Sequence, residues 1–167
     1  MELEKTLSNL NFPNFYQEII DKIDLERAND FVKIIINKLV VKYGSEEISS
    51  EIQRDNSNST ISNHLTHIIE VGGLKIISDN NLPVSLDNRE NFENTIVSVV
   101  FVLNCSLAIE LKKLNLYYGN TSNYYGNDAI SIIVNRLSKH TFEGIKNPNG
   151  LKHYSNQMIQ ENLLYKI

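Results

Sequence analysis

Tryptophan is absent from this chain of 167 residues, cysteine occurs once and proline three times. A single cysteine, Cys105, excludes an internal disulfide and the paired cysteines of zinc and redox motifs. The N-terminal residues MELEKTLSNLNF lack the basic and then apolar pattern of a secretory signal. We therefore expect a cytoplasmic protein with no bound cofactor.

Basic residues are also fewer than acidic residues. The chain has 16 Lys and Arg residues against 20 Asp and Glu residues, for a formal net charge of −4. Broad binding to nucleic acid depends on basic side chains that neutralise phosphates, so nucleic acid is not the expected partner. A basic protein would suit this charge better, because opposite charge speeds encounter.

The longest uncharged run is Asn94–Ile109, NTIVSVVFVLNCSLAI. It is shorter than the roughly 20 apolar residues that cross a bilayer, so no membrane span is expected. It is also apolar on all sides, which is typical of a buried helix. We predict the central helix of one mostly α domain over residues 1–167.

Other helices are predicted from apolar residues that recur at a spacing of 3.6. Their ranges are 13–24, 25–43, 61–71, 87–116, 128–139 and a last helix from residue 155. Gly72 and Gly73 are predicted to end the third of these. Two short apolar stretches around Asp79-Asn80-Asn81 then favour a small β-hairpin at Leu74–Leu86. The predicted fold is a bundle of six or seven helices with this hairpin.

His64, His67 and Glu70 are spaced so that they could share one side of a helix. Imidazole and carboxylate groups suit zinc or iron, and His140 or His153 could add a ligand. No Glu-x-x-His or His-Glu-x-x-His motif accompanies them. The pattern is that of a polar helix flank, and we expect no metal site.

A second candidate chemistry lies at Arg136–His140, RLSKH. This segment resembles a shortened form of the Arg…His motif of HEPN ribonucleases, which are helical bundles of similar size. The resemblance implies catalysis by Arg136 and His140. Only three residues separate them, fewer than in that family, and Leu137 replaces the polar residue that usually follows the arginine.

A tyrosine-rich repeat follows the central helix, because Tyr117-Tyr118-Gly119-Asn120 recurs as Tyr124-Tyr125-Gly126-Asn127. Tyrosine is enriched in protein interfaces, and the repeat contains no basic residue that would favour stacking on nucleic acid. We expect Tyr117, Tyr118, Tyr124, Tyr125 and Asp128 to bind a protein partner.

These observations favour a binding protein over an enzyme. The chain is small and acidic, it lacks a complete catalytic motif, and its many asparagines are typical of AT-rich mobile genes. Our first hypothesis is a bacterial immunity protein that blocks a basic, nuclease-type toxin domain. The alternatives are the HEPN-like ribonuclease and a helical adaptor or phage-encoded inhibitor.

Overall fold

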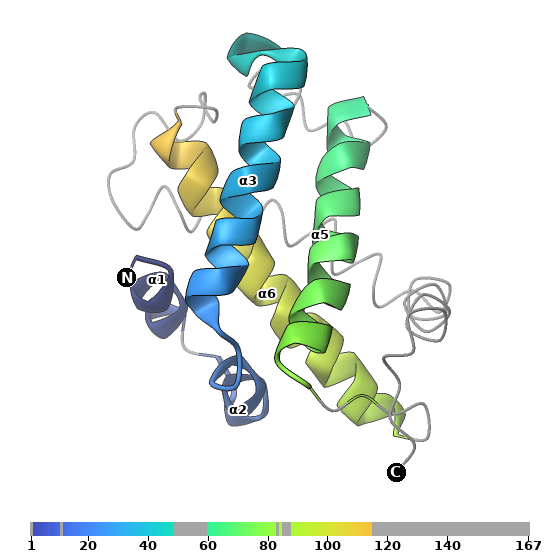
Figure 1. Cartoon of the computed structure of the whole chain (residues 1–167). Coiled ribbons are helices and arrows are strands. Elements are labelled where there is room, and N and C mark those ends of the chain that lie inside the picture. The colour runs from blue at the N-terminus through green and yellow to red at the C-terminus, as the bar shows by residue number, and fades with distance from the viewer. Residues whose placement is uncertain (1, 11, 49–59, 83, 85–87, 115–167) are drawn as a thin grey trace.

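The computed structural model describes residues 2–10, 12–48, 60–82, 84 and 88–114, which are mostly helical (Figure 1). The helices are α1 Glu2–Asn9, α2 Asn14–Ile20, α3 Leu25–Tyr43, α5 Thr60–Asp79 and α6 Arg89–Lys113, and residues 45–48 are also helical. No strand occurs among the described residues. The mostly α class is confirmed, whereas the helix total and the single domain of residues 1–167 stay predictions.

Helix α6 forms the centre of the fold. From Thr95 to Leu111 every residue is buried except Phe101, which is partly buried. Helices α1, α2, α3 and α5 all contact α6, and Figure 1 shows it crossing behind α3 and α5. The predicted burial of the uncharged run is therefore confirmed.

The same helix is longer than the uncharged run that predicted it. Within the described residues, Glu90–Lys113 is the one helix long and apolar enough to span a membrane, and its most apolar window of 18 residues has a mean hydropathy of 1.8. In this fold 89% of its most apolar window is buried. The surrounding helices thus already cover the apolar surface that α6 would present to lipid.

Helix α3 has the boundaries that its sequence predicts. The side chain of Asp24 accepts a hydrogen bond from the backbone N–H of Arg27 at 3.1 Å and so caps the first turn. Gly44 follows the last turn at a φ of +84° and donates its N–H to the carbonyl of Val40 at 2.8 Å. A positive φ is a conformation that glycine adopts without steric cost.

Helix α5 corrects the prediction of a β-hairpin. It continues through Gly72 and Gly73 to Asp79, so residues 74–79 are helical. A Cβ atom on Gly72 would lie 2.8 Å from Cε1 of Phe31 and 3.2 Å from Cδ2 of Leu103. Gly72 therefore allows close packing against α3 and α6, and this packing offsets the roughly 1 kcal/mol that glycine costs in a helix.

The segment predicted as the hairpin turn is the C-terminal cap of α5. The N–H of Leu82 bonds to the carbonyl of Ile77 at 3.1 Å, and the N–H of Asn81 bonds to that of Ser78 at 3.3 Å. Asn81 has a φ of +49°. These two bonds around a left-handed residue define a Schellman motif. Leu82 is buried, as the apolar residue of this motif commonly is.

Helix boundaries elsewhere differ by small amounts from those predicted. Helix α6 is capped by Asn88, whose side chain accepts from the N–H of Asn91 at 3.1 Å, one residue after the predicted Asp87. Helix α2 is shorter than the predicted range 13–24. Helix α1 was not predicted, although its Leu3 and Leu7 are buried in the core.

Candidate functional site

Most residues that the sequence selects for chemistry or binding lie outside the described residues. They are Tyr117, Tyr118, Tyr124, Tyr125, Asp128, Arg136, His140 and His153. Their proposed roles stay predictions.

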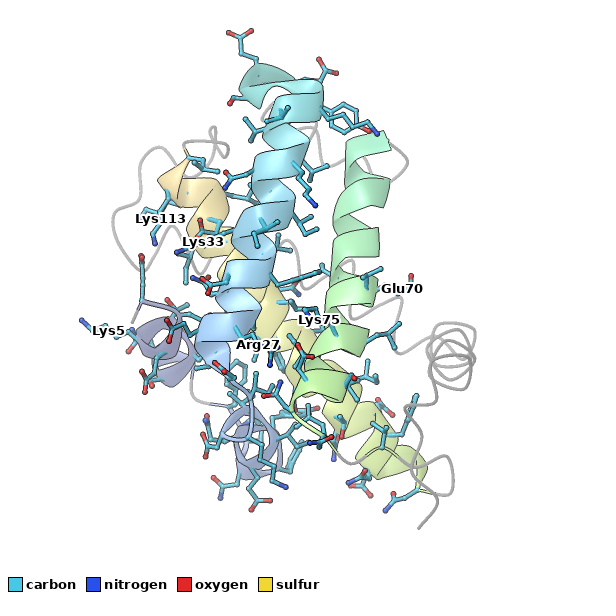
Figure 2. All side chains as sticks on the ribbon, in the orientation of Figure 1. Lys5, Arg27, Lys33, Glu70, Lys75 and Lys113 are labelled. Carbon is cyan, nitrogen blue, oxygen red and sulfur yellow. The ribbon has the colours of Figure 1, made fainter. Side chains whose placement is uncertain are left out.

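The predicted metal-type residues lie on α5. His64 and His67 belong to a part of the helix in which only the backbone is described, and Glu70 is half-buried. Figure 2 shows Glu70 on the side of α5 that faces away from α3. In the described part of the chain, no three His, Cys, Asp or Glu side chains are grouped so that they could hold a metal ion.

The clearest functional feature of the described residues is the distribution of charge. Residues 1–30 contain seven acidic and three basic residues, and the rest of the chain contains thirteen of each. The net charge of −4 is therefore located entirely in the first thirty residues. We call their acidic side chains, all of which are exposed, the acidic surface: Glu2, Glu4, Glu18, Asp21, Asp24, Glu26 and Asp30.

The acidic surface is carried by α1, α2 and the first half of α3, and Figure 1 shows α1 and α2 beside the N-terminal end of α3. Its acids outnumber Lys5, Lys22 and Arg27, the bases in the same residues. Such a surface attracts a basic macromolecule and repels an acidic one.

An aromatic cluster joins α2 to α6 beside the acidic surface. The ring centroid of Phe101 lies 4.5 Å from that of Phe12 and 5.6 Å from that of Tyr16. The ring centroid of Phe15 lies 4.3 Å from that of Tyr16, with the two rings tilted by 59°, and Phe15 is 49% exposed. Partial burial and the negative charge of Glu93 raise the pKa of Tyr16, so its hydroxyl stays protonated and can donate. A half-exposed ring among acidic side chains has the composition of a protein-binding surface.

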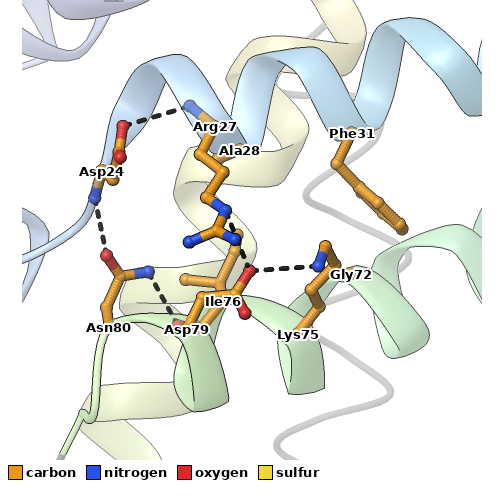
Figure 3. Close-up of a pocket in the computed structure, with 9 residues that line it drawn as sticks. All are labelled: Asp24, Arg27, Ala28, Phe31, Gly72, Lys75, Ile76, Asp79 and Asn80. Carbon is orange, nitrogen blue, oxygen red and sulfur yellow. Dashed lines mark hydrogen bonds and ion pairs between the residues drawn. The ribbon is translucent and has the colours of Figure 1, made fainter.

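A small hollow lies between α3 and the last turns of α5 (Figure 3). Its water-accessible volume is about 10 Å³, which is room for about one water molecule. Small-molecule pockets are typically about 300 Å³ or larger. The hollow therefore does not suit a substrate.

The polar side chains that line this hollow hold the two helices together. Asp79 pairs with Lys75 at 3.1 Å and with Arg27 of α3 at 3.6 Å. Oδ1 of Asn80 accepts from the backbone N–H of Asp24 at 2.8 Å, and its Nδ2 donates to the carbonyl of Ile76. These contacts are drawn in Figure 3. They give the polar side chains around the hollow a structural role, which is to join α3 to α5.

Polar side chains also occur inside the core, on α6. The hydroxyl of Ser106 donates to Oδ1 of Asn29 on α3 at 2.7 Å. Glu110 is 6% exposed, and its Oε1 lies 3.8 Å from Nζ of Lys113. Lys113 in turn pairs with Glu2 of α1 at 3.3 Å. These contacts position α1 and α3 on α6.

Cys105 does not have the surroundings of a reactive cysteine. It is fully buried, and burial raises the pKa of its thiol to about 12. Nucleophilic and redox cysteines need an accessible thiolate, which electropositive surroundings favour. Cys105 therefore acts as a core residue.

The acidic surface could have been found by counting charges along the sequence, because the net negative charge of the chain is confined to residues 1–30. The cluster around Phe101 could not, because it brings together residues about ninety positions apart along the chain.

No family model matches this chain, and neither the curated proteins nor the solved structures include a significant match to it.

Proposed function

We propose that this protein binds and neutralises a basic protein, in the manner of an immunity protein that blocks a nuclease-type toxin. The exposed acidic surface on α1, α2 and α3 carries the proposal. A nuclease site is basic because it holds phosphates, so an acidic protein surface can occupy it. Phe15 would supply the apolar anchor that such interfaces use at their centre.

The predicted tyrosine repeat is compatible with this function as a second contact region. Tyr118 and Tyr124 would add aromatic anchors to an interface that the acidic surface steers. We further propose that the protein acts in the cytoplasm and without a catalytic step, so that its activity depends on binding alone.

The test is protection of a bacterial host. The product of the neighbouring gene, if toxin-like, is expressed with the wild type or with a Glu4→Lys/Glu18→Lys variant. Because the substitutions replace attraction by repulsion, we expect wild-type growth rescue and affinity at least about tenfold weaker in the variant. Affinity of the wild type should fall as salt rises, since salt screens exposed charges.

The matched control is Glu46→Lys/Glu47→Lys, which makes the same charge change at exposed positions outside the acidic surface. This control should protect as the wild type does. Equal loss in both variants would mean that only net charge matters, and protection by both would exclude the acidic surface as the binding site. A further variant, Tyr118→Ala/Tyr124→Ala, tests the tyrosine repeat separately.

A further inference from the structure

The ring of Phe15 on α2 is open to a ligand. The ring of Tyr16, tilted by 59° at a centroid distance of 4.3 Å, covers part of it, and 49% of Phe15 stays exposed. In the described part of the chain, the one cation that lies over an aromatic ring is Lys42, on Tyr43. The exposed part of the Phe15 ring therefore holds no cation from this chain.

A carboxylate lies next to this ring on the same helix. Glu18 follows Phe15 by three residues, a spacing that makes two side chains neighbours on a helix surface. Asp21, the next acid, accepts a hydrogen bond from Nε2 of Gln17 at 2.7 Å. The side chain of Glu18 makes no ion pair or hydrogen bond with another described residue. Glu18 is also exposed, so its oxygens can accept from a partner.

A second carboxylate approaches the two rings from α6. Glu93 is half-buried near the start of α6, and its negative charge acts on the hydroxyl of Tyr16. Phe101, on the same helix, holds the ring of Tyr16 at a centroid distance of 5.6 Å. Glu93 makes no ion pair with any described residue. The rings of Phe15 and Tyr16 thus have carboxylates from two helices near them, and no base of the described chain neutralises either one.

An exposed ring with carboxylates beside it suits a guanidinium group. The negative face of an aromatic ring attracts a cation, and arginine stacks its flat guanidinium on such a face. The N–H groups of the stacked guanidinium then point outward in its plane, where carboxylates can accept them in pairs. The ammonium of lysine is compact and strongly hydrated, so it gains less from the ring and cannot donate in this fork geometry.

We propose that Phe15, Glu18 and Glu93 form a binding surface for an arginine side chain of a protein partner. The guanidinium stacks on the exposed part of the Phe15 ring, and its edge donates to the flanking carboxylates. This inference rests on the proposed function, because it names the group on the basic partner that α2 and α6 recognise. Arginine is a common phosphate-binding residue, so a nuclease bound in this way would lose a group that holds its substrate.

The ring of Phe15 distinguishes this site from the rest of the acidic surface. Acids such as Glu4 attract lysine and arginine alike, because both side chains carry one positive charge. The ring adds an interaction that depends on the shape and hydration of the cation. A preference for arginine over lysine at constant peptide charge is therefore the property to measure.

Two blocked peptides of equal charge test this preference: pentalysine, and the same peptide with arginine at its centre. Their affinities for the full chain are measured by titration calorimetry at low ionic strength, where exposed charges are least screened. We expect the wild type to bind the arginine peptide about threefold more tightly. Phe15→Leu keeps an apolar side chain but removes the ring, so it should bind both peptides equally. Phe15→Tyr restores the ring and should restore the preference.

Charge variants separate the flanking carboxylates from general attraction. Glu18→Gln and Glu93→Gln should each weaken binding of the arginine peptide more than that of pentalysine. Glu4→Gln, the matched control on α1, should weaken both peptides by the same factor, so the preference for arginine stays. Circular dichroism of each variant should match that of the wild type. Equal affinity of the wild type for the two peptides would overturn the proposal, and so would a preference that persists in Phe15→Leu.

This experiment and the test of protection in a bacterial host can fail separately. A wild type that protects cells but binds both peptides equally would keep the proposed function and overturn the arginine site. A wild type that prefers the arginine peptide but does not protect would support the arginine site and contradict the toxin hypothesis.

Discussion

Cys105 lies in the middle of α6, and the packing around it determines its chemistry. Its side chain has no exposed surface, and the pKa of its thiol is raised to about 12 from an ordinary value near 9. We expect a maleimide reagent to leave the native protein unlabelled and to react once denaturant unfolds it. Stoichiometric labelling of native protein, measured by mass spectrometry, would show that the core opens at α6.

The same pKa shift predicts a dependence of stability on pH. Above about pH 9 the unfolded chain releases the thiol proton while the folded chain keeps it, so ionisation favours unfolding. This contribution lowers the free energy of unfolding by up to about 1.4 kcal/mol per pH unit between the two pKa values. Urea unfolding at about pH 8, 9 and 10 should show a steeper loss for the wild type than for Cys105→Ala. An equal loss of stability with pH in the two proteins would contradict this prediction.

Gly72 shows how one missing side chain sets the distance between helices. In an exposed helix, replacing glycine by alanine stabilises by about 1 kcal/mol. At Gly72 the added Cβ would lie 2.8 Å from Phe31, so we expect Gly72→Ala to destabilise the fold instead. Thermal unfolding of Gly72→Ala, Phe31→Ala and the double variant tests the cause. The alanine at 72 should cost less in the Phe31→Ala background, because the closest contact, with the ring of Phe31, is gone.

At the scale of the element, α6 and α3 differ in how much of their surface is covered. Val100 on α6 is 1% exposed, whereas Val41 on α3 is 88% exposed. We expect Val100→Asp to unfold the domain, because an unpaired buried carboxylate costs several kcal/mol. Leu103→Asp should do the same, since Leu103 is fully buried.

Val41→Asp is the matched control for this prediction. The chemical change is identical, but the new carboxylate would remain in water, so the melting temperature should stay within a few degrees of the wild type. Thermal unfolding followed by circular dichroism measures the helix content and the melting temperature of both variants. An unchanged melting temperature for Val100→Asp would mean that α6 is not the core of the fold.

Element boundaries were predictable to different degrees. The boundaries of α3 could be predicted because Asp24 and Gly44 act locally, through a cap and a positive φ. The length of α5 could not, because Gly72 and Gly73 stop a helix unless other helices pack against them. Leu103 and Phe31, which pack on Gly72, lie about thirty and forty residues away along the chain.

At the scale of the whole molecule, the binding hypothesis and the HEPN-like ribonuclease hypothesis predict different results. If the protein acts by binding, Arg136→Ala and His140→Ala should leave its protective activity unchanged, and the pure wild type should not cleave RNA. Incubation of labelled RNA with pure protein and with chelator measures this directly. Metal-independent cleavage that is lost in His140→Ala, with the fold intact, would favour the ribonuclease hypothesis over the binding hypothesis.

The sequence by itself determined the fold class, the central position of α6 and the acidic balance, because periodicity, run length and charge are properties of neighbouring residues. Only the tertiary structure decided that α5 passes through its two glycines and that Phe15 joins a cluster around Phe101. These features depend on contacts between distant segments, and the free energy of packing can reverse a local preference of about 1 kcal/mol.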